Sequence, residues 1–130
     1  MNPERLLIDT SAWILGFKKS GPEELKNLLR VAVLDGNAVT SPPIILELIQ
    51  GCRNEEERTA LRARLESLDR LPVNNDVCER TYDLGFSLRR KGAVVPTVDI
   101  IVAVVAMEHG CTIVHSDRHF EMICTHNPFQ

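Results

Sequence analysis

Short apolar runs recur along this chain and are separated by longer segments with helical periodicity. Leu6-Leu7-Ile8 shows no polar alternation, which predicts a strand buried on both faces, as in a parallel sheet covered by helices. Similar runs predict strands at residues 38–40, 71–73 and 112–114. The intervening segments predict helices at 11–19, 23–35, 43–50, 54–68, 76–91 and 98–108, with a short helix or turn at 118–123. This alternation predicts a three-layer α/β/α domain with a mostly parallel central sheet.

The length and composition of the chain suit one globular domain spanning residues 1–130. The longest apolar run, residues 100–107, is much shorter than the roughly 18 residues that indicate a membrane-spanning helix. The N-terminus lacks the basic region and apolar stretch of a secretory signal. The four cysteines form no Cys-x-x-Cys pair, which suits a reducing compartment. We therefore expect a cytoplasmic protein with no membrane segment.

The formal net charge of −3 restricts how the chain can handle nucleic acid. Proteins that bind nucleic acid usually carry a basic excess, because neutralising phosphates supplies much of their affinity. This chain has no such excess. Binding to RNA would therefore depend on local basic patches and on metal ions placed at the reacting phosphate.

Two aspartates stand where predicted strands end. Asp9 directly follows the strand at 6–8, and Asp117 follows the strand at 112–114. Ligand sites of open α/β sheets lie at the carboxyl edge of the strands. The alternative for Asp9 is a purely structural role as the cap of the next helix. The residues alone leave both interpretations open.

Two further carboxylates lie in strongly apolar helices. Glu47 is the only charged residue in the helical turn 44–49, and buried carboxylates are normally paired, protonated or bound to metal. The alternative is that Glu47 occupies a narrow exposed stripe. Asp99 lies in the first turn of the helix at 98–108, where the helix dipole favours a negative charge. An acid at that position can also be a simple capping aid.

Convergence of these four carboxylates would require protons or cations to offset their repulsion. Oxygen ligands without paired histidines or cysteines suit Mg²⁺ or Mn²⁺ better than Zn²⁺. Such ions activate water and stabilise charge on a phosphodiester during cleavage. The residues by themselves therefore predict metal-assisted hydrolysis of a phosphate ester, without identifying the ester.

Four stretches of the chain, in order, resemble the motifs of the PIN-domain family, and in particular the VapC-like ribonuclease toxins of toxin–antitoxin pairs. The likeness covers nearly the whole chain. Residues 7–13 resemble the opening strand with its aspartate, and residues 41–51 resemble the helix with its glutamate. Residues 96–99 resemble the third motif, and residues 108–120 resemble the closing strand with its acidic loop.

This resemblance implies Mg²⁺- or Mn²⁺-dependent endonucleolytic cleavage of RNA, a homodimer, and a cognate antitoxin that inhibits the enzyme. It also implies that the metal ligands are the four acidic residues already singled out, Asp9, Glu47, Asp99 and Asp117. A hydroxyl of Thr10 or Ser11 would support the site, and Arg118 is a candidate contact for a substrate phosphate. Apolar positions of the helices at 23–35 and 54–68 could serve partner binding or the core.

One position departs from the family pattern. The last motif often carries a second acid two residues after the first, and this chain has His119 there. We expect His119 to pack at the surface or to contact water or a phosphate, and any extra ligand at this position is in doubt.

Two other functions fit part of the pattern. Asp9 after a strand could be the nucleophile of a phosphatase-like hydrolase, although Ser11 occupies the place where a common phosphatase pattern has a second aspartate. A non-catalytic protein-binding module with the PIN fold is the second alternative. The presence of all four acids argues against a module that has lost catalytic activity.

Overall fold

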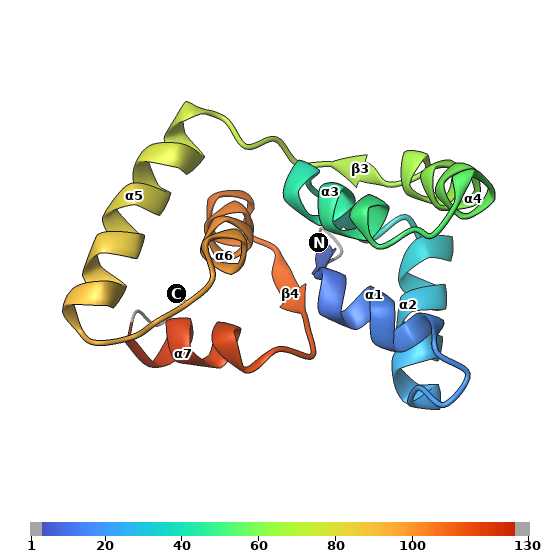
Figure 1. The fold of residues 1–130 in the computed structure, drawn as a ribbon, viewed down its shortest axis with the longest axis horizontal. Coiled ribbons are helices and arrows are strands. Elements are labelled where there is room, and N and C mark those ends of the chain that lie inside the picture. Colours follow the sequence, from blue (N-terminus) through green and yellow to red (C-terminus); the bar gives the residue numbers. More distant parts are fainter. Residues whose placement is uncertain (1–3, 127–130) are drawn as a thin grey trace.

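A computed structural model describes residues 4–126 of the chain. The described residues contain four strands: β1 (Leu6–Ile8), β2 (Ala38–Thr40), β3 (Asp69–Arg70) and β4 (Thr112–Val114). The helices are α1 (Thr10–Phe17), α2 (Glu23–Leu34), α3 (Pro42–Gln50), α4 (Glu55–Glu66), α5 (Asn75–Arg90), α6 (Thr97–His109) and α7 (Arg118–His126) (Figure 1). Within this described part, no helix is both long and apolar enough to cross a bilayer.

The four strands form one parallel sheet in the order β3-β2-β1-β4. From β1 the chain moves outward through β2 to β3, then returns to the other side of β1 to form β4. The direction in which strands are added therefore reverses between β1 and β4. In open α/β sheets, the crevice beyond the carboxyl ends of the strands at such a reversal is the usual place for a ligand.

Helices flank the sheet on both sides, which confirms the predicted three-layer α/β/α class. Figure 1 shows α5, α6 and α7 on one side of the molecule and α1, α2 and α4 on the other. Every side chain of α6 from Val102 to Ala106 is buried, as are Leu7 and Ile8 of β1. The apolar helix predicted near the C-terminal end is thus part of the core, and its first turn, with Asp99, lies at the edge of that core.

The predicted strand at residues 71–73 is wrong. The observed β3 is the pair Asp69–Arg70, which lies alongside Val39 and Thr40 at the edge of the sheet. Both of its residues are exposed, so this strand has no apolar pattern that could be recognised in the sequence. The ladder ends after the amide of Leu71 donates to the carbonyl of Thr40, because β2 is followed by α3, whose first residue, Pro42, has no amide hydrogen. The carbonyl of Leu71 accepts a hydrogen bond from the Ser41 hydroxyl at 2.8 Å instead. Leu71 itself is buried and belongs to the core.

Most helix boundaries differ from the prediction by one to three residues, and two of these differences concern helices that carry or adjoin the site residues. Helix α1 begins at Thr10 and not at Ser11, because Asp9 is its N-cap. Helix α7 extends to His126, beyond the short helix or turn predicted at 118–123, and buries Phe120 and Ile123. Both changes affect segments that directly follow a strand at the carboxyl edge of the sheet.

Candidate metal centre

Asp9 leaves β1 with its two carboxylate oxygens in different environments. Oδ2 accepts hydrogen bonds from the Ser11 amide at 3.0 Å and from the Ser11 hydroxyl at 2.6 Å. Oδ1 is buried and has no hydrogen-bond partner among the described residues, although the residue is only 2% exposed. The capping role and a ligand role are therefore compatible, because one oxygen caps α1 and the other remains available.

Ser11 ties the loop after β1 to the loop after β4. Its hydroxyl oxygen accepts a hydrogen bond from the amide of Ser116 at 2.9 Å while donating to Asp9. The amide of Asp9 also donates to the carbonyl of Val114 at 2.9 Å. These bonds hold the two strand-ending loops together at the point where the strand order reverses.

Asp99, Asp117 and His119 form a compact group of possible ligands. One donor atom from each lies within 4.8 Å of the others. His119 Nδ1 is 2.7 Å from Asp117 Oδ1 and 3.3 Å from Asp99 Oδ2. The backbone amide of His119 also donates to Asp117 Oδ1 at 2.9 Å, which positions Asp117 immediately before α7. Two acids predicted from separate motifs thus meet between the starts of α6 and α7.

The crowding of carboxylates changes their acidity. Burial raises the pKa of Asp99 from 3.8 to about 7, and the negative charges of Asp117 and Asp9 contribute to the shift. For Asp117, burial acts to raise the pKa, but the amide and ring of His119 hold it below its ordinary value. Asp99 therefore keeps its proton close to neutral pH while Asp117 is ionised. Among the residues that the structure describes, Asp9 is not part of the compact group, but its charge contributes to the raised pKa of Asp99.

Glu47 reaches this neighbourhood through Thr10. The Thr10 hydroxyl donates to Glu47 Oε1 at 2.7 Å, across 37 residues of sequence. Glu47 is half-buried on α3, and Thr10 directly follows Asp9 as the first residue of α1. Among the residues that the structure describes, Glu47 is not part of the compact group formed by Asp99, Asp117 and His119. Its bond to Thr10 holds that hydroxyl against Glu47.

The contact of His119 with the acids was not predicted from the sequence. We expected it to lie at the surface or to contact water or a phosphate, whereas its ring touches two of the carboxylates. The available signal was its place two residues after Asp117, where the family pattern often has an acid. Arg118, at the first position of α7, has an exposed side chain.

These residues fit a divalent cation. Oδ1 of Asp9 is buried and has no partner among the described residues, and the negative charges of Asp117 and Asp9 help to raise the pKa of Asp99. A cation placed among these oxygens would offset that repulsion. Carboxylate oxygens are the ligands that Mg²⁺ and Mn²⁺ prefer. The donor set therefore matches the chemistry expected from the sequence.

Comparison with known proteins identifies the family. The sequence pattern of the PIN domain matches residues 6–125. The chain belongs to the PIN domain family. Ribonuclease VapC11 of Mycobacterium tuberculosis is a relative with 30% identity over 128 residues, an alignment that covers 91% of this chain and 90% of VapC11.

Solved structures of other PIN-like chains share the fold. The DNA-bound VapBC complex from Salmonella typhimurium contains a similar chain with a TM-score of 0.78 and 22% identity, covering 92% of both chains. Mycobacterium tuberculosis VapC20, described as a sarcin-ricin loop cleaving toxin, has a TM-score of 0.66 and 20% identity, covering 89% of this chain and 92% of VapC20. At these identities the similarity establishes the PIN fold. The family resemblance inferred from the four motifs is confirmed.

Proposed function

We propose that this PIN domain is a metal-dependent endoribonuclease and the toxin of a toxin–antitoxin pair. The observation that carries the proposal is the meeting of Asp99 and Asp117 beside His119 where the strand order reverses. The charge of Asp9 also contributes to the raised pKa of Asp99. The relative at 30% identity is named a ribonuclease, which supports RNA as the substrate. The cytoplasmic location and the homodimer expected from the sequence stay predictions.

Asp9, Glu47, Asp99 and Asp117 would hold Mg²⁺ or Mn²⁺. When bound, such an ion polarises a phosphate oxygen and lowers the pKa of a bound water. The protein's own groups prepare the site: Ser11 orients Asp9, and the amide of His119 orients Asp117. Asp99 must lose its proton to offer both oxygens, which its pKa of about 7 permits near neutral pH.

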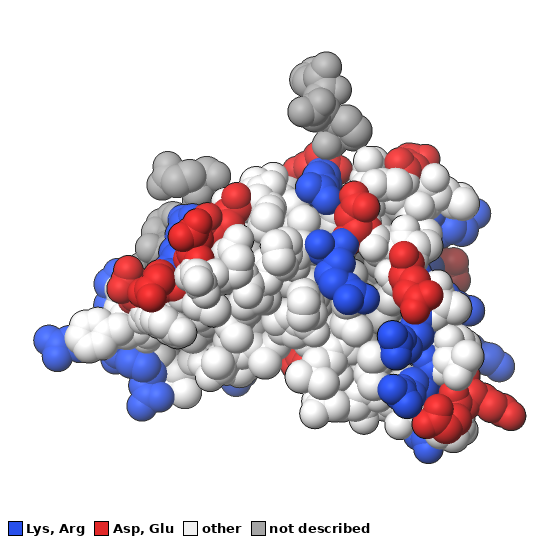
Figure 2. All heavy atoms as spheres, turned by 90° about the horizontal axis from the view of Figure 1, so that it is seen from above, with Lys and Arg blue, Asp and Glu red and all other residues white. Residues whose placement is uncertain are grey.

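The charge distribution supports a cation as the main attraction for the reacting phosphate. On the face drawn in Figure 2, basic and acidic side chains alternate around a broad uncharged centre. That face supplies no continuous positive field for an RNA backbone. A cation held by three or four carboxylates would place positive charge directly at the scissile phosphate. Arg118, beside Asp117, is our candidate for an additional phosphate contact.

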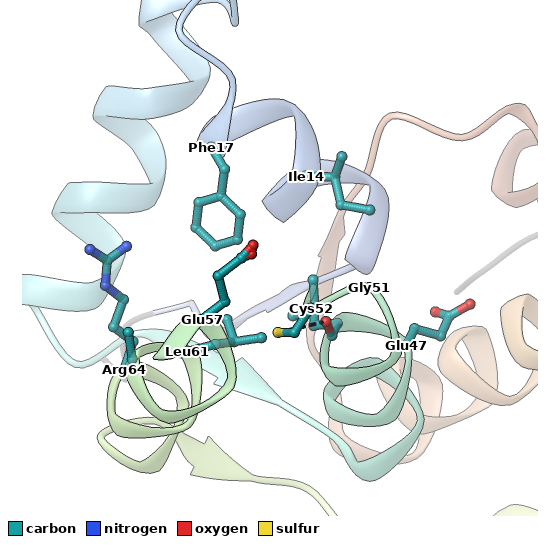
Figure 3. A pocket seen from close by; sticks show the side chains of 10 residues that line it. Ile14, Phe17, Glu47, Gly51, Cys52, Glu57, Leu61 and Arg64 are labelled. Carbon is teal, nitrogen blue, oxygen red and sulfur yellow. Dashed lines mark hydrogen bonds between the residues drawn. The ribbon is translucent and has the colours of Figure 1, made fainter. Parts of the chain in front are cut away.

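An apolar pocket beside the site supports a protein partner. It lies between α1, α3 and α4, has a volume of about 470 Å³, and Figure 3 shows Ile14, Phe17 and Leu61 around it, with Glu47 at one end. Ile14 and Phe17 are about half exposed, although both are apolar. Exposed apolar surface that adjoins a site commonly marks a partner interface. We propose that the antitoxin covers this pocket, and the similarity to the VapBC complex supports such a partner.

Cleavage of a mixed RNA pool tests the proposed activity. We would compare wild type, Asp9→Asn and the control Asp83→Asn, which removes the same charge from an exposed position of α5. Each protein would be assayed with Mg²⁺, with Mn²⁺ and with EDTA. We expect discrete fragments from wild type and Asp83→Asn with metal, and none from Asp9→Asn or with EDTA. Metal-dependent release of phosphate from a phosphomonoester without RNA cleavage would instead favour the phosphatase-like alternative.

A further inference from the structure

The ring nitrogen Nδ1 of His119 lies close to two carboxylates of the site. Its Nδ1 lies 2.7 Å from Asp117 Oδ1 and 3.3 Å from Asp99 Oδ2, and its side chain is only 25% exposed. Its backbone amide is bonded to the same Asp117 oxygen, so the start of α7 fixes both residues relative to one another. The ring therefore lies beside both acids with the backbone as it stands.

His119 Nδ1 is close to two carboxylates at once. Although this nitrogen is close to both carboxylates, it is buried and makes no hydrogen bond of acceptable geometry with a described residue. Here the nitrogen and one oxygen from each acid lie within 4.8 Å of one another, a spacing that a single cation can bridge.

We infer that His119 is a nitrogen ligand of the metal centre, beside Asp99 and Asp117, and that it shifts the preference of the centre from Mg²⁺ toward Mn²⁺. This inference rests on the proposed function, because it concerns the same cation. The physical reason is the donor type. Mg²⁺ binds hard oxygens in a strict octahedron, whereas imidazole nitrogen is a better ligand for transition-metal ions. Oδ1 of Asp9, which has no hydrogen-bond partner among the described residues, would supply a further oxygen.

The test measures metal binding and metal coordination directly. Mn²⁺ and Mg²⁺ would be titrated separately by calorimetry into the metal-free full chain as wild type, His119→Gln and His119→Asp. His109→Gln is the matched control, because His109 ends α6, ten residues and about 15 Å from Asp99. Electron spin echo modulation of the bound Mn²⁺ would report whether a ¹⁴N nucleus is coordinated.

We expect ¹⁴N modulation in wild type and His109→Gln, and none in His119→Gln or His119→Asp. The affinity for Mn²⁺ should fall about tenfold or more in His119→Gln, since mutation even of residues that only contact metal ligands lowers metal affinity by that much. The affinity for Mg²⁺ should fall less. His119→Asp should bind Mg²⁺ more tightly relative to Mn²⁺ than wild type does, because it replaces nitrogen with oxygen.

Two results would overturn the inference. The first is a wild-type Mn²⁺ complex without ¹⁴N modulation. The second is tighter binding of both ions by His119→Gln, which would show that His119 only offsets carboxylate charge in the metal-free protein. If wild type cleaves RNA with Mn²⁺ in either case, only the role of His119 is refuted. If wild type neither binds Mn²⁺ nor cleaves RNA, the proposed function fails as well.

Discussion

Replacement of Asp99 by asparagine removes a carboxylate from the most crowded part of the site while keeping its shape. Asp99 is 7% exposed, in the first turn of α6, and faces Asp117, Asp9 and His119. Asparagine is neutral at every pH, so the variant avoids the cost of a buried charge. We expect Asp99→Asn to fold, to lose RNA cleavage, and to gain stability in the absence of metal.

The size of the gain follows from the pKa of Asp99. This value is 3.8 ordinarily and about 7 in the folded protein. Between these pH values the unfolded chain is ionised while the folded chain keeps the proton, so stability falls as pH rises and then levels off above about 7. A difference of about 3 pKa units corresponds to about 4 kcal/mol of unfolding free energy. We expect Asp99→Asn to be about 2–4 kcal/mol more stable than wild type at pH 8, because asparagine does not reproduce every hydrogen bond of the protonated acid.

Urea unfolding followed by circular dichroism, in EDTA between pH 4 and pH 8, measures this difference. The two proteins should have similar stability at pH 4 and diverge toward neutral pH. Excess Mg²⁺ should then stabilise wild type, by about 2.7 kcal/mol at a concentration 100 times the Kd, and have little effect on the variant. Wild-type stability that does not fall between pH 4 and pH 7 would refute the electrostatic reasoning. Loss of folded structure in Asp99→Asn would make Asp99 a structural cap.

Three further results are expected. Thr10→Val removes the hydroxyl bound to Glu47 at 2.7 Å, so cleavage should fall about tenfold while the unfolding free energy changes by about 1 kcal/mol; unchanged cleavage would exclude a supporting role for Thr10. Metal affinity should rise with pH up to about 7, because the proton on Asp99 competes with the cation, and calorimetry that finds no pH dependence would contradict this. Arg118→Ala should weaken RNA binding in a filter assay and reduce its salt dependence, and an unaltered affinity would remove Arg118 from the substrate site.

Several parts of the fold could be predicted because their causes are local. The apolar run at Leu6–Ile8, followed at once by Asp9, indicates both a buried strand and an acid at its carboxyl end. The parallel arrangement then brings Asp9 and Asp117 to the same edge of the sheet, since the carboxyl ends of parallel strands lie together. The opposite case is β3, whose two exposed residues are selected by pairing with β2 and carry no pattern of their own.

The residue types and their order determined that the chain is an α/β domain of the PIN family with acids at strand ends and helix starts. Only the tertiary structure decided how those acids are partnered. Thr10 meets Glu47 across 37 residues, and His119 meets Asp99 because α6 and α7 begin at the same edge of the sheet. Such contacts depend on the positions of whole helices relative to one another. Periodicity describes the faces of a single helix, so it could not reveal that a histidine two residues after Asp117 would also touch Asp99.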